Sequence, residues 1–466
     1  MSTDISFGTD GWRAVIAEGF TFANVRLVAN AIAVAARGLD VPAGVDPNRL
    51  TVGFDRRFLS PEFAAEVASI LRDSGYEVIL STDPSPAQTV SFSNVRLGAI
   101  GGVMVTASHN PAKYNGLKFK GSYGGSALPE TYAAIGRAIG SEDRRDGGSL
   151  RREDLLDDYV IALREKLDIE KLSKAKLSIL HDPIYGVASG LPERVLEGSA
   201  ARVTTIRGEH DPSFGGVNPE PIPNNLGPSI ARMKEGGFDL AICNDGDADR
   251  VGILDEKGEF VSPHKVIALL ALYMIRRKGM TGEIVKTFST SRLVENVARG
   301  LGVPFHETPI GFKYVADLML TRDILIGGEE SGGVGFGWFL PERDGILSGL
   351  LVAECIAEAG RPLSVLVKEM EEEFSTLYYD RRDLLRPQAA IDRLIESVRS
   401  GGMDRAFGGE VASREEKDGV KLNFTDGGWI LFRKSGTEPI IRIYAESPSK
   451  DAVTSMLARA AAELEG

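Results

Sequence analysis

Three aspartates at alternate positions, Asp245, Asp247 and Asp249 in "NDGDADR", are the residues of this sequence with the most direct chemistry. Carboxylates at this spacing repel one another unless a cation holds them, and hard oxygen ligands suit Mg²⁺ or Ca²⁺. The trio follows the apolar run "FDLAIC", and Arg250 comes directly after it. The pattern therefore predicts a metal site at the end of a buried strand, in preference to a solvated acidic turn.

An EF-hand loop is the alternative for this stretch, because Glu256 stands at the twelfth position counted from Asp245. The sixth position is Arg250, where that loop requires glycine for its sharp turn. The flanking segments have the composition of strands, and the second flank predicts a hairpin around residues 256–258. The sequence therefore favours a metal-binding loop between strands over a helix-loop-helix unit.

A second candidate is Ser108 in "TASHNP", which follows the apolar run "LGAIGGVMV". Pro111 ends any regular element, so a buried strand is expected to present the serine in an exposed turn. No GxSxG elbow is present, and His109 is a poor direct base because neighbouring side chains diverge, so a serine hydrolase is disfavoured. A serine oxygen that carries phosphate would give the aspartates a further metal ligand, which favours phosphoryl transfer.

Composition limits the kinds of partner. The 466 residues are 43% hydrophobic and 26% charged, which is typical of a water-soluble chain with several domains. With 54 basic and 66 acidic residues the net charge is -12, so neither nucleic acid nor an anionic membrane is an expected partner. The two cysteines, the lack of an export signal and the short apolar runs favour a cytoplasmic protein with free thiols.

The order of strand and helix patterns divides the chain into four domains. Strands alternate with helices through most of the sequence, as in residues 50–54, 60–75 and 77–81, which predicts three similar mixed α/β domains with largely parallel sheets. The last part has short strands joined by turns and predicts an antiparallel α+β domain. The expected domains are residues 1–153, 154–257, 258–374 and 375–466.

Three loops with polar residues follow apolar strands, one in each of the three α/β domains. They are "TASHNP", "NDGDADR" and "GGEESGG". Ligands bind beyond the carboxyl ends of strands in sheets of this kind. Because the loops occupy equivalent topological points, we expect them to act together.

Four stretches in this order, "TASHNP", "GDADR", "GEESGG" and "RKSGTEP", resemble the signature loops of the α-D-phosphohexomutases. That family includes phosphoglucomutase, phosphomannomutase and phosphoglucosamine mutase; the opening "FGTDGWR" fits it, and the resemblance covers essentially the whole chain. It implies a heart-shaped, four-domain monomer around a central cleft to which each domain contributes one loop. It also implies reversible phosphoryl transfer between the 1- and 6-positions of a hexose phosphate, through a phosphoserine and a hexose 1,6-bisphosphate, which also acts as activator.

The resemblance implies roles by position. Ser108 is the expected phosphoserine, whose phosphate holds Mg²⁺ together with Asp245, Asp247 and Asp249. Lys118 in "YNGLKF" is the expected general acid or base, either with a pKa shifted from its usual value of about 10.4 or acting mainly through its charge. Further groups are expected to orient the reactants or to neutralise charge: His109, Arg13 and Arg250.

Substrate contacts are expected from the third and fourth domains. Glu329 can accept hydrogen bonds from two sugar hydroxyls, Ser331 adds a smaller contact, and Arg433 offers a fork to phosphate. The other expected ligands are Ser435, Gly436 and Thr437 and, with surface positions as the alternative, Lys286, Thr308 and Gly311. The last domain is expected to be attached by few contacts and to rotate so that it closes the cleft.

The middle of the sugar loop varies with the substrate in this family. "GEES", with Glu330, is similar to the glucose mutases, whereas "RKSGTEP" and "FGTDGWR" also resemble the glucosamine branch. Glucose 1-phosphate is the first expectation, followed by mannose 1-phosphate and then glucosamine phosphate. A phosphoserine-dependent sugar phosphatase and a non-catalytic Ca²⁺-binding protein are the alternatives from other classes, and neither explains the basic loop of the last domain.

Overall fold

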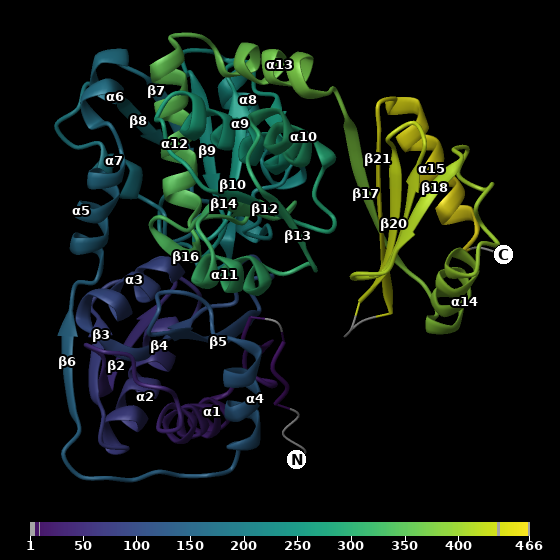
Figure 1. Ribbon diagram of the computed structural model, residues 1–466. Coiled ribbons are helices and arrows are strands. Elements are labelled where there is room, and N and C mark those ends of the chain that lie inside the picture. Colours follow the sequence, from purple (N-terminus) through teal and green to yellow (C-terminus); the bar gives the residue numbers. More distant parts are fainter. Residues whose placement is uncertain (1–4, 9, 436–438, 465–466) are drawn as a thin grey trace.

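The computed structural model describes residues 5–8, 10–435 and 439–464, which form four domains, each built on one sheet (Figure 1). The first sheet has the strand order β1-β5-β4-β2-β3-β6. Its strands are β1 (Trp12–Val15), β2 (Asp46–Phe54), β3 (Glu77–Ser81), β4 (Ala99–Val105), β5 (Tyr114–Gly121) and β6 (Ser149–Glu153). Its helices are α1 (Phe22–Ala36), α2 (Ser60–Asp73), α3 (Ala87–Leu97) and α4 (Pro129–Arg137).

The second domain repeats this design with a five-stranded sheet of order β11-β10-β9-β7-β8. Its strands are β7 (Ser178–Asp182), β8 (Arg202–Thr205), β9 (Leu240–Asn244), β10 (Val251–Asp255) and β11 (Phe260–Val261). Its helices are α5 (Leu156–Lys166), α6 (Ile169–Ala175), α7 (Leu191–Val195) and α8 (Gly227–Lys234). The hairpin of β10 and β11 extends this sheet past the expected domain boundary at residue 257.

The third domain has a sheet of order β13-β12-β14-β15-β16. Its strands are β12 (Glu283–Thr287), β13 (Phe305–Thr308), β14 (Ile324–Gly328), β15 (Val334–Phe336) and β16 (Leu340–Arg343). Its helices are α9 (Pro263–Arg276), α10 (Arg292–Leu301), α11 (Phe312–Thr321), α12 (Gly345–Ala359) and α13 (Leu363–Phe374).

All three sheets are mixed and share one pattern. Parallel pairs (β4 with β2, β9 with β7, β14 with β12) lie beside antiparallel pairs (β4 with β5, β9 with β10, β14 with β15). Each sheet is therefore parallel on one side only. The expectation of largely parallel sheets is wrong for the other side. There the chain turns back after a short loop, and no helix precedes the next strand.

The short loop that reverses the chain is the polar loop in every domain. Residues 106–113 join β4 to β5, residues 245–250 join β9 to β10, and residues 329–333 join β14 to β15. This confirms that the three loops occupy equivalent topological points. Because strands flank residues 245–250, the EF-hand alternative is excluded.

The first three domains are joined by buried contacts. Helix α12 of the third domain packs on β9 and β10 of the second, and one apolar cluster from Leu156 to Met370 runs through both domains. The first domain joins them through a fully buried ion pair between Lys120 and Glu342. Gln88 of α3 also donates to the carbonyl of Ala248 at 3.0 Å. These contacts hold the three polar loops in fixed relative positions.

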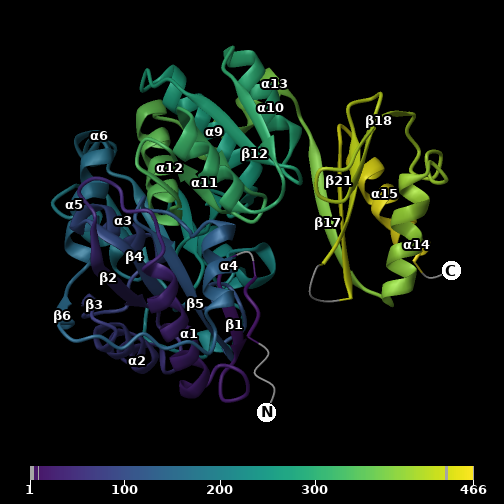
Figure 2. The same ribbon diagram turned by 60° about the horizontal axis from the view of Figure 1, so that its bottom comes forward.

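The fourth domain is an antiparallel sheet of order β17-β21-β20-β19-β18, as predicted for the end of the chain. Its strands are β17 (Tyr378–Leu385), β18 (Val411–Glu415), β19 (Val420–Phe424), β20 (Trp429–Lys434) and β21 (Ile440–Ser447), and its helices are α14 (Gln388–Arg399) and α15 (Lys450–Ala462). In both views this domain stands to one side of the other three, and β17 leads into it from α13 (Figures 1 and 2).

Two expectations from composition can be checked within the described ranges. Cys243 and Cys355 are both buried and free, as predicted. No described helix has both the length and the apolar character that a membrane span needs.

Candidate active site

Ser108 lies in the turn between β4 and β5 with its side chain aimed at the aspartate loop of the second domain. Its hydroxyl donates to Asp245 Oδ2 at 2.8 Å. The residue is only 1% exposed, so the expectation of an exposed turn is wrong. The second domain covers the turn so closely that a Cβ on Gly246 would lie 2.6 Å from the Ser108 carbonyl oxygen. The first two domains therefore meet at the serine itself.

The aspartate trio is buried and compact. One carboxylate oxygen from each of Asp245, Asp247 and Asp249 lies within 4.8 Å of the others. Burial, together with the charges of Asp249 and Asp247, raises the pKa of Asp245 well above its ordinary value. The Oδ1 atoms of Asp247 and Asp249 are buried without a hydrogen-bond partner. Crowded carboxylates with free oxygen atoms are the donor set that a hard divalent cation requires, so the residues fit Mg²⁺.

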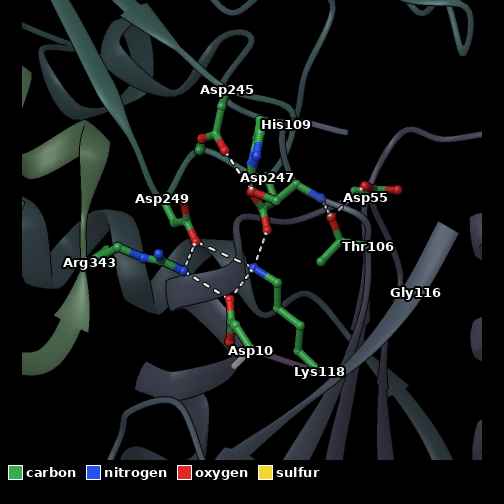
Figure 3. Close-up of polar contacts among 12 residues, drawn as sticks. Asp10, Asp55, Thr106, His109, Gly116, Lys118, Asp245, Asp247, Asp249 and Arg343 are labelled. Carbon is green, nitrogen blue, oxygen red and sulfur yellow. Dashed lines mark hydrogen bonds and ion pairs between the residues drawn. The ribbon is translucent and has the colours of Figure 1, made fainter. Parts of the chain in front are cut away.

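Lys118 reaches the trio from β5, which pairs with β4 so that Lys118 lies opposite Met104. Its Nζ lies 2.9 Å from Asp247 Oδ2, 3.4 Å from Asp249 Oδ2 and 3.0 Å from Asp10 Oδ2 (Figure 3). Burial by itself lowers the pKa of Lys118, but these three carboxylates outweigh it and raise the pKa above the ordinary value. The lysine is therefore held as a cation beside the metal ligands.

Two further charged residues complete this network and were missed from the sequence. Arg343 Nη2 donates to Asp249 Oδ2 at 2.6 Å and to Asp10 Oδ2 at 2.9 Å (Figure 3). Its Nη1 lies 3.5 Å from Glu329 Oε2 in the predicted sugar loop. Arg343 thus links the aspartate loop and the predicted sugar loop to Asp10, which precedes β1 in the first domain. Asp10 stands in the quoted "FGTDGWR", which was the one available signal for it; no motif marked Arg343.

The residues expected to orient the reactants lie around the serine, and His109 contacts it directly. His109 Nδ1 lies 3.4 Å from Ser108 Oγ, so the expectation that these neighbouring side chains diverge is wrong. The reason is the positive φ of Ser108, +53°, which folds the chain back at this point. Burial and the nearby charge of Arg250 lower the pKa of His109 well below its ordinary value. The imidazole is therefore neutral.

Two arginines hold the loops in place. Arg13 Nη1 donates to Asn110 Oδ1 at 2.7 Å, which ties β1 to the serine loop. The backbone N–H of Arg250 donates to Asp245 Oδ1 at 2.9 Å, while its side chain donates to Glu220 Oε1 at 2.8 Å. Both residues thus lie beside the predicted centre.

The predicted ligands of the third domain have distinct environments. Glu329 is buried and Ser331 is half-buried in the same turn; burial raises the pKa of Glu329 above its ordinary value. Lys286 is 1% exposed and pairs with Glu307, so the surface alternative is wrong for it. Thr308 ends β13, and Gly311 precedes α11 with a φ of +128°.

In the fourth domain Arg433 pairs with Asp418, its Nε 3.0 Å from Asp418 Oδ1. The other oxygen of Asp418 accepts from the Ile310 backbone N–H at 3.1 Å, so this pair lies at the junction with the third domain. Within the described ranges Arg433 has no hydrogen bond or ion pair with the Ser108 loop. The Ser435 N–H donates to the carbonyl of Ile440 at 2.8 Å. The predicted ligands Gly436 and Thr437 lie outside the described residues.

Comparison with known families matches almost the whole chain. Residues 4–146, 157–258 and 262–374 match the phosphoglucomutase/phosphomannomutase alpha/beta/alpha domains I, II and III, and residues 385–463 match the C-terminal domain of the same family. The chain belongs to the phosphoglucomutase/phosphomannomutase family. The resemblance to the phosphohexomutases, enzymes of the isomerase type, is thereby confirmed.

Individual members of the family carry different substrate names. A phosphoglucomutase/phosphomannomutase of Thermococcus kodakarensis is 32% identical over 96% of this chain and 95% of its own length. A phosphoglucosamine mutase of Paenarthrobacter aurescens is 31% identical over 95% of this chain and 93% of its own length. A crystal structure from Thermus thermophilus, described as a phosphomannomutase, covers 100% of both chains with 38% identity and a TM-score of 0.89.

Proposed function

We propose that this phosphohexomutase interconverts the 1- and 6-phosphates of a hexose by passing a phosphoryl group through Ser108. The observation that carries the proposal is the 2.8 Å hydrogen bond from Ser108 Oγ to Asp245, which places the hydroxyl against the buried aspartate trio. A phosphoserine there would share the cation of the trio. The phosphoryl group would leave the serine for the free hydroxyl of the hexose phosphate. The bisphosphate so formed would return its other phosphoryl group to the serine.

The metal ligands in this proposal are Asp245, Asp247, Asp249 and a phosphate oxygen on Ser108. Mg²⁺ bound there would neutralise charge on the transferring group. The unpartnered Oδ1 atoms of Asp247 and Asp249 support this assignment, since a buried carboxylate oxygen without a donor is costly unless a cation occupies it.

The cationic side chains around the trio would stabilise the negative charge that the transfer develops. Lys118 and Arg343 are held beside the metal ligands by Asp10, so their charges are fixed in advance. Because the surrounding carboxylates keep Lys118 protonated, it serves better as a proton donor or a fixed charge than as a base. His109, within 3.4 Å of the serine oxygen, would orient the hydroxyl.

The remaining contacts would bind the sugar and its second phosphate. Glu329 would accept from sugar hydroxyls, with Ser331 beside it, because Arg343 fixes the Glu329 carboxylate near the metal loop. Arg433 and the rest of its loop would hold the phosphate that is not reacting. Lys286, Thr308 and Gly311 are the weaker members of this set, since Lys286 is already paired with Glu307.

Mannose or glucosamine phosphate is a better candidate than glucose phosphate for this chain. The relatives are named phosphomannomutase or phosphoglucosamine mutase, or carry the joint phosphoglucomutase/phosphomannomutase name, which weighs against the glucose expectation. Glu330, the residue behind that expectation, pairs with Arg381 of the fourth domain at 3.2 Å and accepts from Ser289 Oγ at 3.3 Å. A contact between domains therefore accounts for a glutamate here without any reference to glucose.

The direct test is a mutase assay on the 1-phosphates of glucose, mannose and glucosamine, each with Mg²⁺ and a trace of the matching bisphosphate. We expect conversion to the 6-phosphate, fastest with mannose or glucosamine. Steady release of inorganic phosphate in place of the 6-phosphate would identify a phosphatase. A preference for glucose would overturn the substrate proposal, and no turnover of any of the three would overturn the mutase assignment.

A further inference from the structure

A buried arginine beneath the serine loop holds the backbone of that loop. Arg57 follows β2, is 1% exposed, and its guanidinium faces the carbonyl oxygens of the turn. Nη2 donates to Ser108 O and to Asn110 O, both at 2.6 Å, and Nη1 donates to Pro111 O at 2.9 Å and to Tyr114 O at 3.0 Å. A planar guanidinium has five N–H donors and can bond four carbonyls at once. A lysine ammonium has three donors and cannot do so.

A buried aspartate, Asp55, holds the same loop through the Thr106 hydroxyl, which in turn bonds the Ser108 N–H. Asp55 Oδ2 accepts from Thr106 Oγ1 at 2.7 Å, and Thr106 Oγ1 accepts from the Ser108 N–H at 2.8 Å (Figure 3). Asp55 Oδ1 accepts from Ser60 Oγ at 2.6 Å and from the Arg57 N–H at 2.9 Å. Ser60 is the first residue of α2, and its hydroxyl is directed to Asp55 and does not cap the helix.

The two buried charges also face each other. Arg57 Nε lies 3.2 Å from Asp55 Oδ2 as an ion pair, although its N–H is not aligned for a hydrogen bond. The guanidinium carbon lies 4.9 Å from the ring centroid of Phe214, which belongs to the second domain. A charge pair placed between two domains and bonded chiefly to one loop is an unusual use of buried charge, because packing alone would favour apolar residues.

The loop that these residues hold has a backbone that needs support. Ser108 has a φ of +53°, in the left-handed region that non-glycine residues avoid. Such a conformation persists only where the surroundings impose it. The bonds to both its N–H and its carbonyl, from Thr106 and Arg57, are the ones that impose it here.

We propose that Asp55, Arg57 and Thr106 are positioning residues for the phosphoryl transfer at Ser108. They act on the backbone of Ser108 and so fix the direction of its Oγ toward the aspartate loop. The proposal rests on the proposed function, since it assigns these residues to the same serine. Their role is distinct from metal or substrate binding, because they reach the serine from inside the first domain.

The consequence is a loss of rate without a matching loss of affinity. In-line transfer requires the serine oxygen, the phosphorus and the accepting hydroxyl to align, and an error near 1 Å costs about 100-fold in rate. The sugar contacts lie on other domains, so KM is expected to move little. A role in folding alone would lower stability and leave the kcat of the folded enzyme unchanged.

Thr106→Val tests the proposal with an isosteric change that removes the hydroxyl, and Thr106→Ser restores it. We expect kcat to fall by roughly 10- to 100-fold in Thr106→Val with KM within about threefold, and Thr106→Ser to recover most of the loss. Thr51→Val is the matched control. Thr51 is equally buried, lies in the middle of β2 and donates to Asn94 Oδ1 at 2.5 Å, so it should lose stability but keep kcat.

Arg57→Lys is the second variant, because it keeps the positive charge near Asp55 but loses the guanidinium that bonds the four carbonyls. Its readout is the rate at which Ser108 gains a phosphoryl group from a hexose 1,6-bisphosphate, followed by intact mass. We expect this phosphorylation rate to fall by roughly 10- to 100-fold, the same factor as the kcat of Thr106→Val. If wild-type protein is active, and Thr106→Val matches its kcat while Arg57→Lys matches its rate of Ser108 phosphorylation, the positioning proposal is wrong. If wild-type protein is itself inactive on all three sugars, the proposed function fails instead.

Discussion

The junction between the first two domains and the junction between the last two are built in opposite ways. At the first, Ser108 and the aspartate trio are buried and in direct contact. At the second, Arg433 and Asp418 keep 21% and 25% of their side-chain surface exposed. Buried charges at short range are fixed and strongly coupled, whereas partly exposed pairs are weakened by solvent. The predicted catalytic centre at Ser108 is therefore rigid, whereas the predicted phosphate-binding residue Arg433 is reached by solvent.

The second junction nevertheless has side-chain contacts of its own. An aromatic and apolar cluster, Phe288, Trp429, Leu431 and Tyr444, joins the third and fourth domains. Lys421 donates to the Phe288 carbonyl at 2.6 Å, and Arg292 donates to Asn423 and to the carbonyl of Gly427, both at 2.7 Å. These contacts lie between side chains and loops, and the packing of described helices and strands across this junction is sparse, as expected. A closing movement of the fourth domain would have to preserve this cluster or carry part of the third domain along.

The largest expected effect comes from breaking the first junction at the serine. Ser108→Ala removes the proposed phosphoryl carrier, so mutase turnover should fall by on the order of 1000-fold or more. The fold should persist, because the hydroxyl fills little space and its contacts are limited to Asp245 and His109 among the described residues. Ser348→Ala is the control, since Ser348 is equally buried but bonds within α12. Near-normal activity in Ser108→Ala would remove the serine from the mechanism.

Removing one metal ligand should come next. Asp247→Asn takes one charge from the trio, so we expect activity to fall by about 100-fold and the gain in melting temperature on adding Mg²⁺ to shrink. Chelation of the wild-type protein should abolish activity in the same way. Asp255→Asn, a nearly buried acid in β10 outside the trio, should leave the Mg²⁺ response intact. An unchanged Mg²⁺-dependent shift in Asp247→Asn would contradict the assigned site.

A smaller effect is expected at the second junction. Arg433→Ala should raise KM by about tenfold or more, because a charge-assisted contact with phosphate is lost, and should leave the Mg²⁺ response of the first junction unaltered. Arg414→Ala, which breaks an ion pair with Asp404 elsewhere in the same domain, is the control. A KM that stays at the wild-type value would take Arg433 out of phosphate binding.

The smallest effect is a dependence of stability on pH at the second junction. The ring of His264 lies 4.2 Å from that of Tyr379 of the fourth domain. Burial, together with Lys286 and Lys265, lowers its pKa to about 3. Between its usual pKa near 6.5 and about 3, the unfolded chain binds a proton that the folded chain excludes. The free energy of unfolding should therefore fall with falling pH, by up to about 1.4 kcal/mol per pH unit from this group.

Urea unfolding between pH 6.5 and 4.5 measures that slope. His264→Gln should make it less steep, because glutamine does not titrate and can still accept a hydrogen bond from the Ser291 N–H. His210→Gln, at an exposed position, should leave the slope as in the wild type. Equal slopes in all three proteins would show that His264 has no part in the acid sensitivity.

The sequence was informative where chemistry and local structure coincide. The apolar strands before Ser108, Asp245 and Glu329 are visible as runs of residues, so their loops and their equivalence could be predicted. β5 was not predicted, because "YNGLKF" is short and mixed in polarity, although its pairing with β4 is what brings Lys118 to the centre. The antiparallel sides of the first and third sheets were missed for the same reason, whereas the hairpin that forms β10 and β11 was predicted.

Contacts between distant parts of the chain could not be predicted from residue patterns. Arg343 and Asp10 are 333 residues apart and meet only because the domains pack together. Arg57 follows a strand as an ordinary charged residue, and nothing in its sequence neighbours indicates that four carbonyls surround it. The expectation of glucose as the substrate also depended on a loop motif. The motif does not reveal that Glu330 makes a contact between domains.

The most direct test of the account is the phosphorylation of Ser108 itself. Protein incubated with Mg²⁺ and a hexose 1,6-bisphosphate should gain one phosphoryl group per chain, peptide mapping should place it on Ser108, and adding hexose 1-phosphate should remove it and return it as bisphosphate. Absence of that phosphoryl group in protein that still interconverts the sugar phosphates, or its location on another residue, would contradict the central claim.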